Sequence, residues 1–192
     1  RYGVFNYGPQ KWTMNNLNVT HQSNSRFFDE IVLRLAHQFF EESRVSRNIN
    51  SPNKATRTEK VNAYSINIDF SKTLALNNKI YYGVEYVRNE INSTGINQNI
   101  VTGTSQEGPS RYPQATWQSM GVFVNNQYLV TDKTSLQAGL RYNKYILKAD
   151  FDTTFYPFPF TEANIDNGSL TGSAGIVFRP TDKWVISSNA AT

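Results

Sequence analysis

The sequence predicts an all-β fold that consists of about eight long antiparallel strands. Three observations predict this fold. First, apolar and polar residues alternate with a period of two in several stretches, as expected of strands whose two faces meet different surroundings. Second, the connections between those stretches are alternately short and long. Third, all seven prolines lie in these connections or before the first predicted strand, where no N–H group is needed for a ladder.

The two predicted elements nearest the N-terminus carry the weakest signal. Residues 11 to 22 are predicted to form a strand on which Leu17 and Val19 alternate with polar residues. Residues 29 to 43 fit two structures. Apolar residues at helical spacing behind Asp29, a plausible N-cap, favour an amphipathic helix, whereas a period of two favours a strand. The position of this segment between a short turn and a long polar stretch favours the strand.

Five further segments show the alternation clearly. In chain order, their apolar residues are Tyr64, Ile66, Ile68 and Phe70; Ile80, Tyr82, Val84 and Tyr86; Met120, Val122, Val124, Tyr128 and Val130; Leu136, Ala138, Leu140 and Tyr142; and Leu170, Ala174, Ile176 and Phe178. Phe123 interrupts the pattern of the third segment. A last strand is predicted after Lys183. These strands are longer than the ~5–6 residues that are usual in globular sheets.

The connections divide into two classes by size. Short turns are predicted near Asn24, Asn78, Asp132 and Asp182, at intervals of 54, 54 and 50 residues. Long polar stretches occupy residues 43 to 60, 92 to 116 and 151 to 168. The repeating unit is therefore a long hairpin, with short turns at one end of the sheet and long loops at the other.

Long hairpins of this kind are typical of a transmembrane β-barrel. No stretch approaches the ~20 apolar residues that a membrane-spanning helix needs, which excludes a helical membrane protein. In a barrel, every backbone group finds a partner within the closed sheet, and the apolar face contacts lipid. Five aromatic residues near the predicted rims are expected to form an interfacial girdle: Trp12, Trp117, Tyr128, Tyr142 and Trp184. The predicted short turns would be periplasmic and the long loops extracellular.

The charge distribution selects candidate ligand-binding residues in the loops. Five basic residues between positions 43 and 60 face a single acidic residue, and this excess accounts for the whole net charge of +4. No basic face follows the chain, so no nucleic-acid partner is predicted. The candidates are Arg44, Arg47 and Arg57 in the first loop, Arg111 and Tyr112 in the second, and Phe155, Tyr156 and Phe158 in the third. Their alternative roles are a merely solvated loop and packing between neighbouring loops.

Catalytic chemistry is not predicted. The chain has no cysteine and only two histidines, His21 and His37, which do not have the spacing of a metal site. No Ser/His/Asp order, phosphate-binding glycine loop or close carboxylate pair stands out. We therefore predict no enzyme activity, no cofactor and no resident metal.

One hairpin carries a resemblance to a known family. Residues 121 to 128, GVFVNNQY, lead through Thr131-Asp132-Lys133 to LQAGLRY at residues 136 to 142. This hairpin resembles the barrel of TonB-dependent outer-membrane receptors, and residues 172 to 184 look like the hairpin that follows it in that family. Residues 7 to 12 and 39 to 44 look most like the receptors for haem, haemoglobin and transferrin.

The resemblance implies that residues 1 to 192 are part of a receptor barrel of roughly 22 strands, without its plug domain and its remaining strands. It also implies TonB-dependent uptake of an iron-bearing ligand, which would be haem, a haemoprotein or a ferric siderophore. The implied partners are outer-membrane lipid, that ligand, and the TonB complex through the plug domain. Two alternatives stay open: a complete small outer-membrane barrel with an adhesion or structural role, and a soluble β-sandwich that binds carbohydrate.

Overall fold

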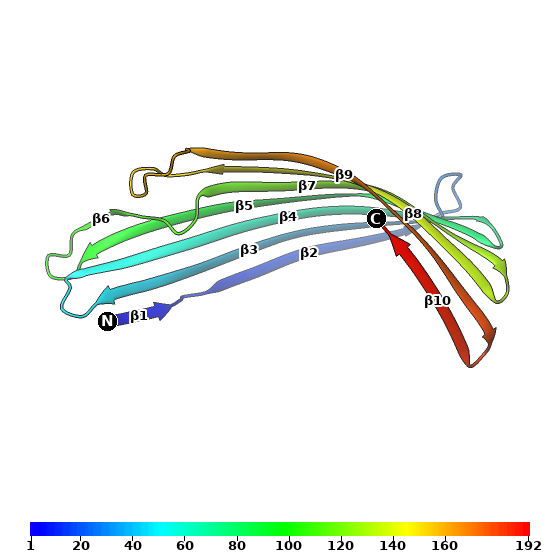
Figure 1. Ribbon diagram of the computed structural model, residues 1–192, viewed down its shortest axis with the longest axis horizontal. Coiled ribbons are helices and arrows are strands. Elements are labelled where there is room, and N and C mark those ends of the chain that lie inside the picture. Colours follow the sequence, from blue (N-terminus) through cyan, green and yellow to red (C-terminus); the bar gives the residue numbers. More distant parts are fainter.

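The computed structural model describes all 192 residues as a single antiparallel sheet of ten strands (Figure 1). The strands are β1 (Tyr2–Tyr7), β2 (Lys11–Gln22), β3 (Glu30–Asn48), β4 (Asn53–Ala75), β5 (Asn78–Asn99), β6 (Ser105–Gly108), β7 (Gln114–Thr131), β8 (Thr134–Asp150), β9 (Glu162–Thr181) and β10 (Trp184–Ala191). The eight predicted strands are all present, and the short strands β1 and β6 were not predicted. No helix that could cross a bilayer is present.

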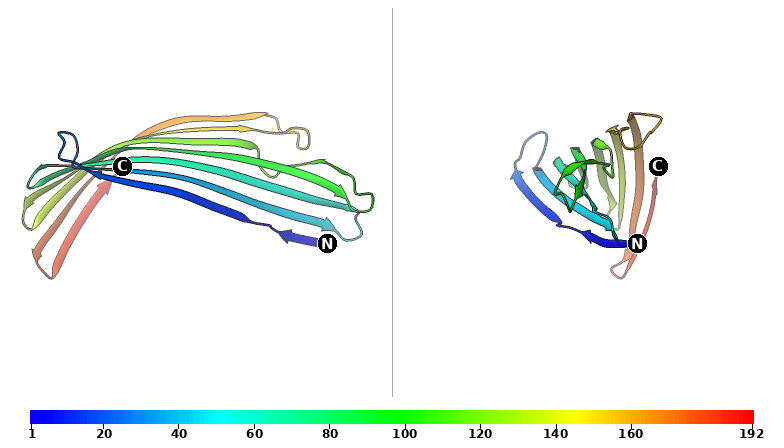
Figure 2. Two further views of the ribbon diagram at one scale, coloured as in Figure 1. Left: turned by 180° about the vertical axis from the view of Figure 1, so that it is seen from behind. Right: turned by 90° about the vertical axis from the view of Figure 1, so that its left-hand side faces the viewer.

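The sheet is open and has two edges. Its order is β1-β3-β4-β5-β7-β8-β9-β10, and β2 also pairs with β3. Strands β2 and β1 occupy successive lengths of the same edge, because β2 pairs with residues 30 to 41 and β1 with residues 44 to 48. Seen from one end, the sheet is curved (Figure 2, right). A single sheet without a second layer is not a β-sandwich, so that alternative is wrong.

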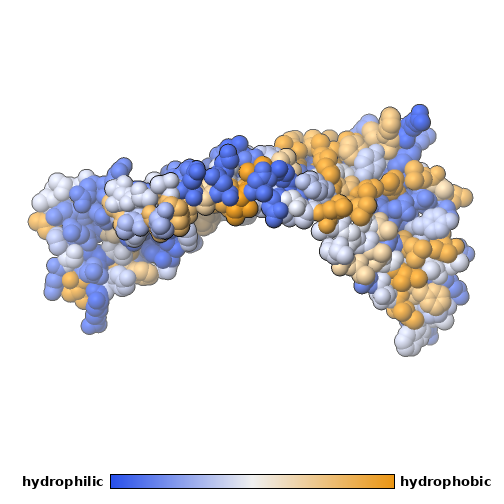
Figure 3. Space-filling view, turned by 45° about the horizontal axis from the view of Figure 1, so that its top comes forward, coloured by the Kyte–Doolittle hydropathy of each residue, from blue (hydrophilic) through white to orange (hydrophobic).

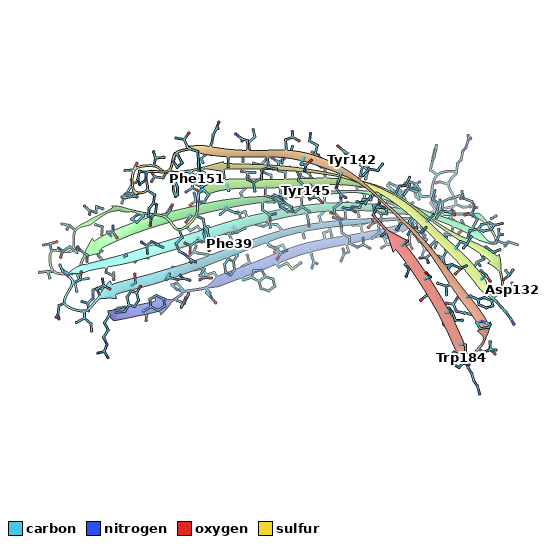
Figure 4. All side chains as sticks on the ribbon, in the orientation of Figure 1. Phe39, Asp132, Tyr142, Tyr145, Phe151 and Trp184 are labelled. Atoms are coloured by element: carbon cyan, nitrogen blue, oxygen red, sulfur yellow. The ribbon has the colours of Figure 1, made fainter.

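The connections lie at two ends of the sheet. At the turn end, three of the four connections are two-residue turns, and the connection between β2 and β3 spans residues 23 to 29. The loop end carries residues 49 to 52, residues 100 to 113, which include β6, and residues 151 to 161. In Figure 4, Asp132 and Trp184 lie at the turn end and Phe151 at the loop end.

Cross-strand register produces an apolar belt on one face, which we call the outer face. One row of directly paired residues runs Leu33, Ile68, Val84, Val122, Tyr142 and Leu170. Four of these six side chains are exposed, among them Val122 at 51% and Leu170 at 69%. Hydrophobic residues gather toward the turn end, and the loop end is more hydrophilic (Figure 3). An uncovered apolar belt across a whole sheet requires an apolar surrounding.

The opposite face, the inner face, is polar at the level of the belt. Arg34 forms an ion pair with Asp69, and Nη2 of Arg141 lies 3.1 Å from Oε1 of Glu85. Phe123, which interrupted the alternation, also lies on this face. A Cβ atom at Gly83 would come within 2.8 Å of the Phe123 ring, so the missing side chain at Gly83 makes room for it.

The strands extend much further toward the loop end than predicted. Strand β3 continues to Asn48 and β4 begins at Asn53, so the predicted long loop 43 to 60 is mostly a hairpin. The predicted loops at 92 to 116 and 151 to 168 are shortened in the same way. Beyond the belt both faces of the strands carry polar residues, so the alternation disappears although the backbone ladder continues.

The segment that fitted both a helix and a strand is resolved. Residues 30 to 48 form a strand, and Asp29 is not a helix cap. Instead, its carboxylate accepts hydrogen bonds from Nζ of Lys72 at 2.6 Å and from the Thr73 amide at 2.7 Å. This arrangement fixes the connection between β2 and β3 to the end of β4.

The predicted aromatic girdle is partly wrong. Tyr128 and Tyr142 lie on the outer face, where they pair with Leu136 and Val122. Trp12 and Trp117 lie on the inner face, because they pair with Phe40 and Leu147. A residue's position near a rim therefore does not show whether its side chain lies on the outer or the inner face; its strand register does.

Candidate ligand-binding site

The inner face changes character between the belt level and the loop end. Beyond the polar residues, one row of directly paired positions is apolar across five strands: Phe40, Val61, Ile91, Ala115 and Ala149. Trp117 and Leu147 lie in the neighbouring row on the same face. The inner face therefore has an apolar surface near the loop end.

A segment from the connection between β5 and β7 folds over this surface. We call residues 108 to 113 the strap. The Ser93 hydroxyl oxygen accepts hydrogen bonds from the amides of Arg111 and Tyr112, each at 3.3 Å. Nε of Arg57 donates to the Pro109 carbonyl at 3.1 Å, and the Gln114 side-chain amide donates to the Ser93 carbonyl at 2.6 Å. These bonds hold the strap against β4 and β5.

Close backbone approach beneath the strap depends on Gly95. A Cβ atom at this position would overlap the carbonyl oxygens of Gly108 and Pro109. Ser93, two residues earlier on the same face, is only 2% exposed. Small residues on β5 thus allow the strap to lie directly on the strand.

The strap and the apolar row enclose a pocket of about 610 Å³. Its apolar walls come from Phe40, Val61, Ile91, Tyr112, Pro113 and Ala115, and its charged residues are Glu42, Arg44, Glu59 and Arg111. The volume lies within the ~300–1,000 Å³ typical of small-molecule sites, which also combine apolar walls with a few polar groups.

Two arginines reach the pocket from different parts of the chain. The guanidinium of Arg44, on β3, lies 4.5 Å from the centre of the Tyr7 ring. Arg111, in the strap, lies 5.0 Å from the ring centre of Tyr112, and its Nη1 is 3.5 Å from Oε2 of Glu59. Both guanidinium groups are thus oriented by an aromatic neighbour.

Glu59 is the most buried charged group of the pocket, with 6% of its surface exposed. It lies on the part of β4 beyond the apolar belt. Burial raises the pKa of Glu59; the neighbouring arginines Arg111 and Arg44 oppose this shift, and Glu42 adds to it. Oε1 of Glu59 and Nε of Arg44 are both buried without a hydrogen-bond partner. Buried polar atoms without a partner cost free energy, so the charged groups of the pocket are not fully paired among themselves.

The structure brings together three of the eight sequence-predicted candidates. Arg44, Arg111 and Tyr112 line the pocket. Arg57 holds the strap and does not line the pocket. Arg47 lies three positions after Arg44 on β3, so its side chain is on the outer face, and its Nη1 donates to the Ser51 carbonyl at 3.0 Å. The basic segment is therefore split between the two faces.

The three remaining candidates lie in the loop between β8 and β9. Phe158 stacks on Phe160 with ring centres 5.7 Å apart, and Tyr156 lies 5.9 Å from Phe158. Phe155 lines a smaller hollow on the far side of the strap, with Pro113 and Gln114. The aromatic residues thus pack largely on one another, and Tyr156 and Phe158 stay about two-fifths exposed (44% and 41%).

Sequence reasoning missed Glu59, Ser93 and Gly95. Glu59 was counted only as an opposing charge, and nothing in the sequence distinguishes Ser93 or Gly95 from other small residues. The one available signal is that Glu59 lies two positions before Val61, so on a strand both side chains are on the same face.

Comparison with known proteins gives a family and a fold. The family model described as TonB-dependent receptor-like, β-barrel matches residues 1–192. A search of curated proteins found no match.

Three solved structures are similar in fold. The copper transporter OprC has a TM-score of 0.70 at 13% identity, over 93% of this chain and 29% of that one. The ferric citrate transporter FecA in its unliganded form gives 0.65 at 9% identity, over 95% and 27%. The siderophore receptor PiuA from Acinetobacter baumannii gives 0.63 at 15% identity, over 90% and 30%. The chain therefore spans less than a third of the length of each.

Proposed function

Because this chain belongs to the TonB-dependent receptor-like β-barrel family, we propose that it forms part of the wall of a receptor that imports an iron-bearing ligand across the outer membrane. Barrels of this family are outer-membrane proteins. The proposed ligand is haem, a haemoprotein or a ferric siderophore. The loop end would face the outside of the cell and the turn end the periplasm.

The pocket under the strap is the observation that carries this proposal. It lies on the inner face, beyond the apolar belt on the loop side, so in a closed barrel it would open into the outer vestibule. Its apolar walls and two arginines suit a ligand with both ring surface and negative charge. The three similar proteins are a copper transporter, a ferric citrate transporter and a siderophore receptor, which also favours a metal-bearing ligand.

The polar inner face at belt level supports a second part of the proposal. Ion pairs such as Arg141 with Glu85 would face either water or a polar partner inside the barrel. A plug domain filling the lumen is such a partner, and energy delivered through TonB would move it. Transport would then be a conformational process in which the wall makes and breaks no covalent bonds.

Uptake by cells tests the proposal. A strain that lacks the gene is grown under iron limitation, complemented with the full-length protein, and supplied with radioactive iron as haem or as siderophore complexes. We expect complementation to restore uptake of at least one form, and loss of that uptake when TonB is deleted. Equal uptake with and without the gene for every form would exclude the proposed function.

A further inference from the structure

The two arginines of the pocket define a more specific ligand chemistry. They come from segments far apart in the sequence, β3 and the strap, yet line the same pocket. The Arg44 guanidinium forms no ion pair and donates no hydrogen bond, and it lies 4.5 Å from the centre of the Tyr7 ring. Arg111 is the only partner of Glu59 among the ion pairs, at 3.5 Å, which is longer than a strong charge-assisted hydrogen bond. Both guanidinium groups therefore have unused capacity to bind an anion.

We propose that this pocket binds its ligand through an anionic oxygen group, a carboxylate or a catecholate, held between Arg44 of β3 and Arg111 of the strap. The assignment rests on the proposed function, which supplies the reason for a ligand on this face. Guanidinium groups form two parallel hydrogen bonds to such oxygen pairs, and the apolar row beneath supports the rest of the ligand.

Charge around the site agrees with an anion. Glu59 and Glu42 are the acidic groups that line the pocket. Glu59 is already paired with Arg111 at 3.5 Å, and burial raises the pKa of its carboxyl group. Arg57, which anchors the strap beside the pocket, adds a third positive charge. The arginines therefore attract an anionic ligand and repel a cationic one.

The ligand also competes with Glu59 for Arg111. An anion that binds the Arg111 guanidinium breaks the ion pair between Arg111 and Glu59. The hydrogen bonds of Ser93 and Arg57 to the strap backbone remain. The strap then stays in place and only the Arg111 side chain turns to the ligand. Binding is expected without unfolding of the strap.

Ligand titration of the full-length protein in detergent tests this inference. The probes are haem, which carries carboxylates, the ferric complex of 2,3-dihydroxybenzoate, which is a catecholate, and ferrioxamine B, which is a cation. Quenching of tryptophan fluorescence reports binding, since Trp117 lies on the same face. We expect haem or the catecholate complex to bind and ferrioxamine B to bind much more weakly.

Matched variants separate the pocket from the rest of the receptor. Arg44→Gln and Arg111→Gln should each weaken binding of the anionic probe by about tenfold or more, since each removes charged hydrogen bonds. Arg47→Gln, three positions along the same strand but on the outer face, should bind like the unchanged protein. Arg111→Lys keeps the positive charge but cannot form two parallel hydrogen bonds, so it should give an intermediate affinity.

The outcomes distinguish the two proposals. If the unchanged protein binds neither anionic probe, the pocket assignment fails, and the uptake measurement still decides the proposed function. If it binds an anionic probe and the Arg44 and Arg111 variants bind equally well while remaining folded by circular dichroism, only the pocket assignment fails. Tight binding of ferrioxamine B that survives both substitutions would also overturn the assignment and leave the receptor function standing.

Discussion

At the residue scale, single polar side chains fix the connections at the ends of this sheet. Asp29 is the clearest example, because it holds Lys72 and the Thr73 amide at the turn end. The hydrogen bond from Lys72 is the main cause, and the Thr73 amide the second, of the lowering of the Asp29 pKa to about 2. The same interaction was invisible in the sequence, where Asp29 looked like a helix cap.

This lowered pKa predicts an acid-dependent loss of stability. A carboxylate whose pKa is lower in the folded state stabilises the fold at pH values above its unfolded pKa. That contribution is lost as pH falls from about 4 to about 2. We therefore expect Asp29→Asn to lower the thermal midpoint at pH 7 and to have progressively less effect in this acidic range.

Thermal unfolding of the full-length protein in detergent, followed by circular dichroism, measures this effect. Asp132→Asn, in the two-residue turn between β7 and β8, is the control and should change the midpoint little. A midpoint difference for Asp29→Asn that is the same at pH 7 and pH 2 would contradict the assigned cause.

At the scale of elements, the strap can lie on β5 only because Gly95 has no side chain. Gly95→Ala would place a methyl group where the carbonyl oxygens of Gly108 and Pro109 lie. Because backbone atoms cannot turn away as a side chain can, the strap would have to shift and lose bonds to Ser93. We expect faster cleavage by trypsin after Arg111 in this variant.

The cleavage rate at Arg111 is measured by limited proteolysis and mass spectrometry. Thr94→Val is the control, since Thr94 neighbours Gly95 but lies on the outer face and pairs with Thr58. Unchanged protection of Arg111 in Gly95→Ala would show that the strap is held without close approach to β5.

The elements differ in how far the sequence could predict them. Strands such as residues 62 to 70 were predictable because one face carries the apolar belt and the other does not. The strand extensions toward the loop end were not, since polar residues occur on both of their faces and the period-two pattern is lost. The strap could not be predicted either, because it depends on contacts between Ser93 and residues 18 to 19 positions away. Arg44 and Arg47 are an odd number of positions apart, so once residues 43 to 48 are known to be a strand, the sequence places their side chains on opposite faces.

At the scale of the whole molecule, stability requires an apolar surrounding for the outer face. Only ten residues are buried in the sheet, and Ala149 is the one hydrophobic residue among the buried core. A soluble protein of this size would bury a large apolar core of its own. No second layer of this sheet shields the apolar belt from water, so the belt needs an apolar surrounding such as lipid to be stable.

Paired arginine substitutions on β8 test this dependence. Leu140 lies in the belt and is 56% exposed, whereas Gln137 lies three positions away on the inner face. Leu140→Arg should destabilise the protein in lipid vesicles by ~2–4 kcal/mol, because a charge is brought into hydrocarbon near the midplane. Gln137→Arg should have a mild effect, since its side chain stays among polar groups. Urea unfolding of the full-length protein in vesicles gives both free energies, and equal tolerance at the two positions would mean that the belt does not face lipid.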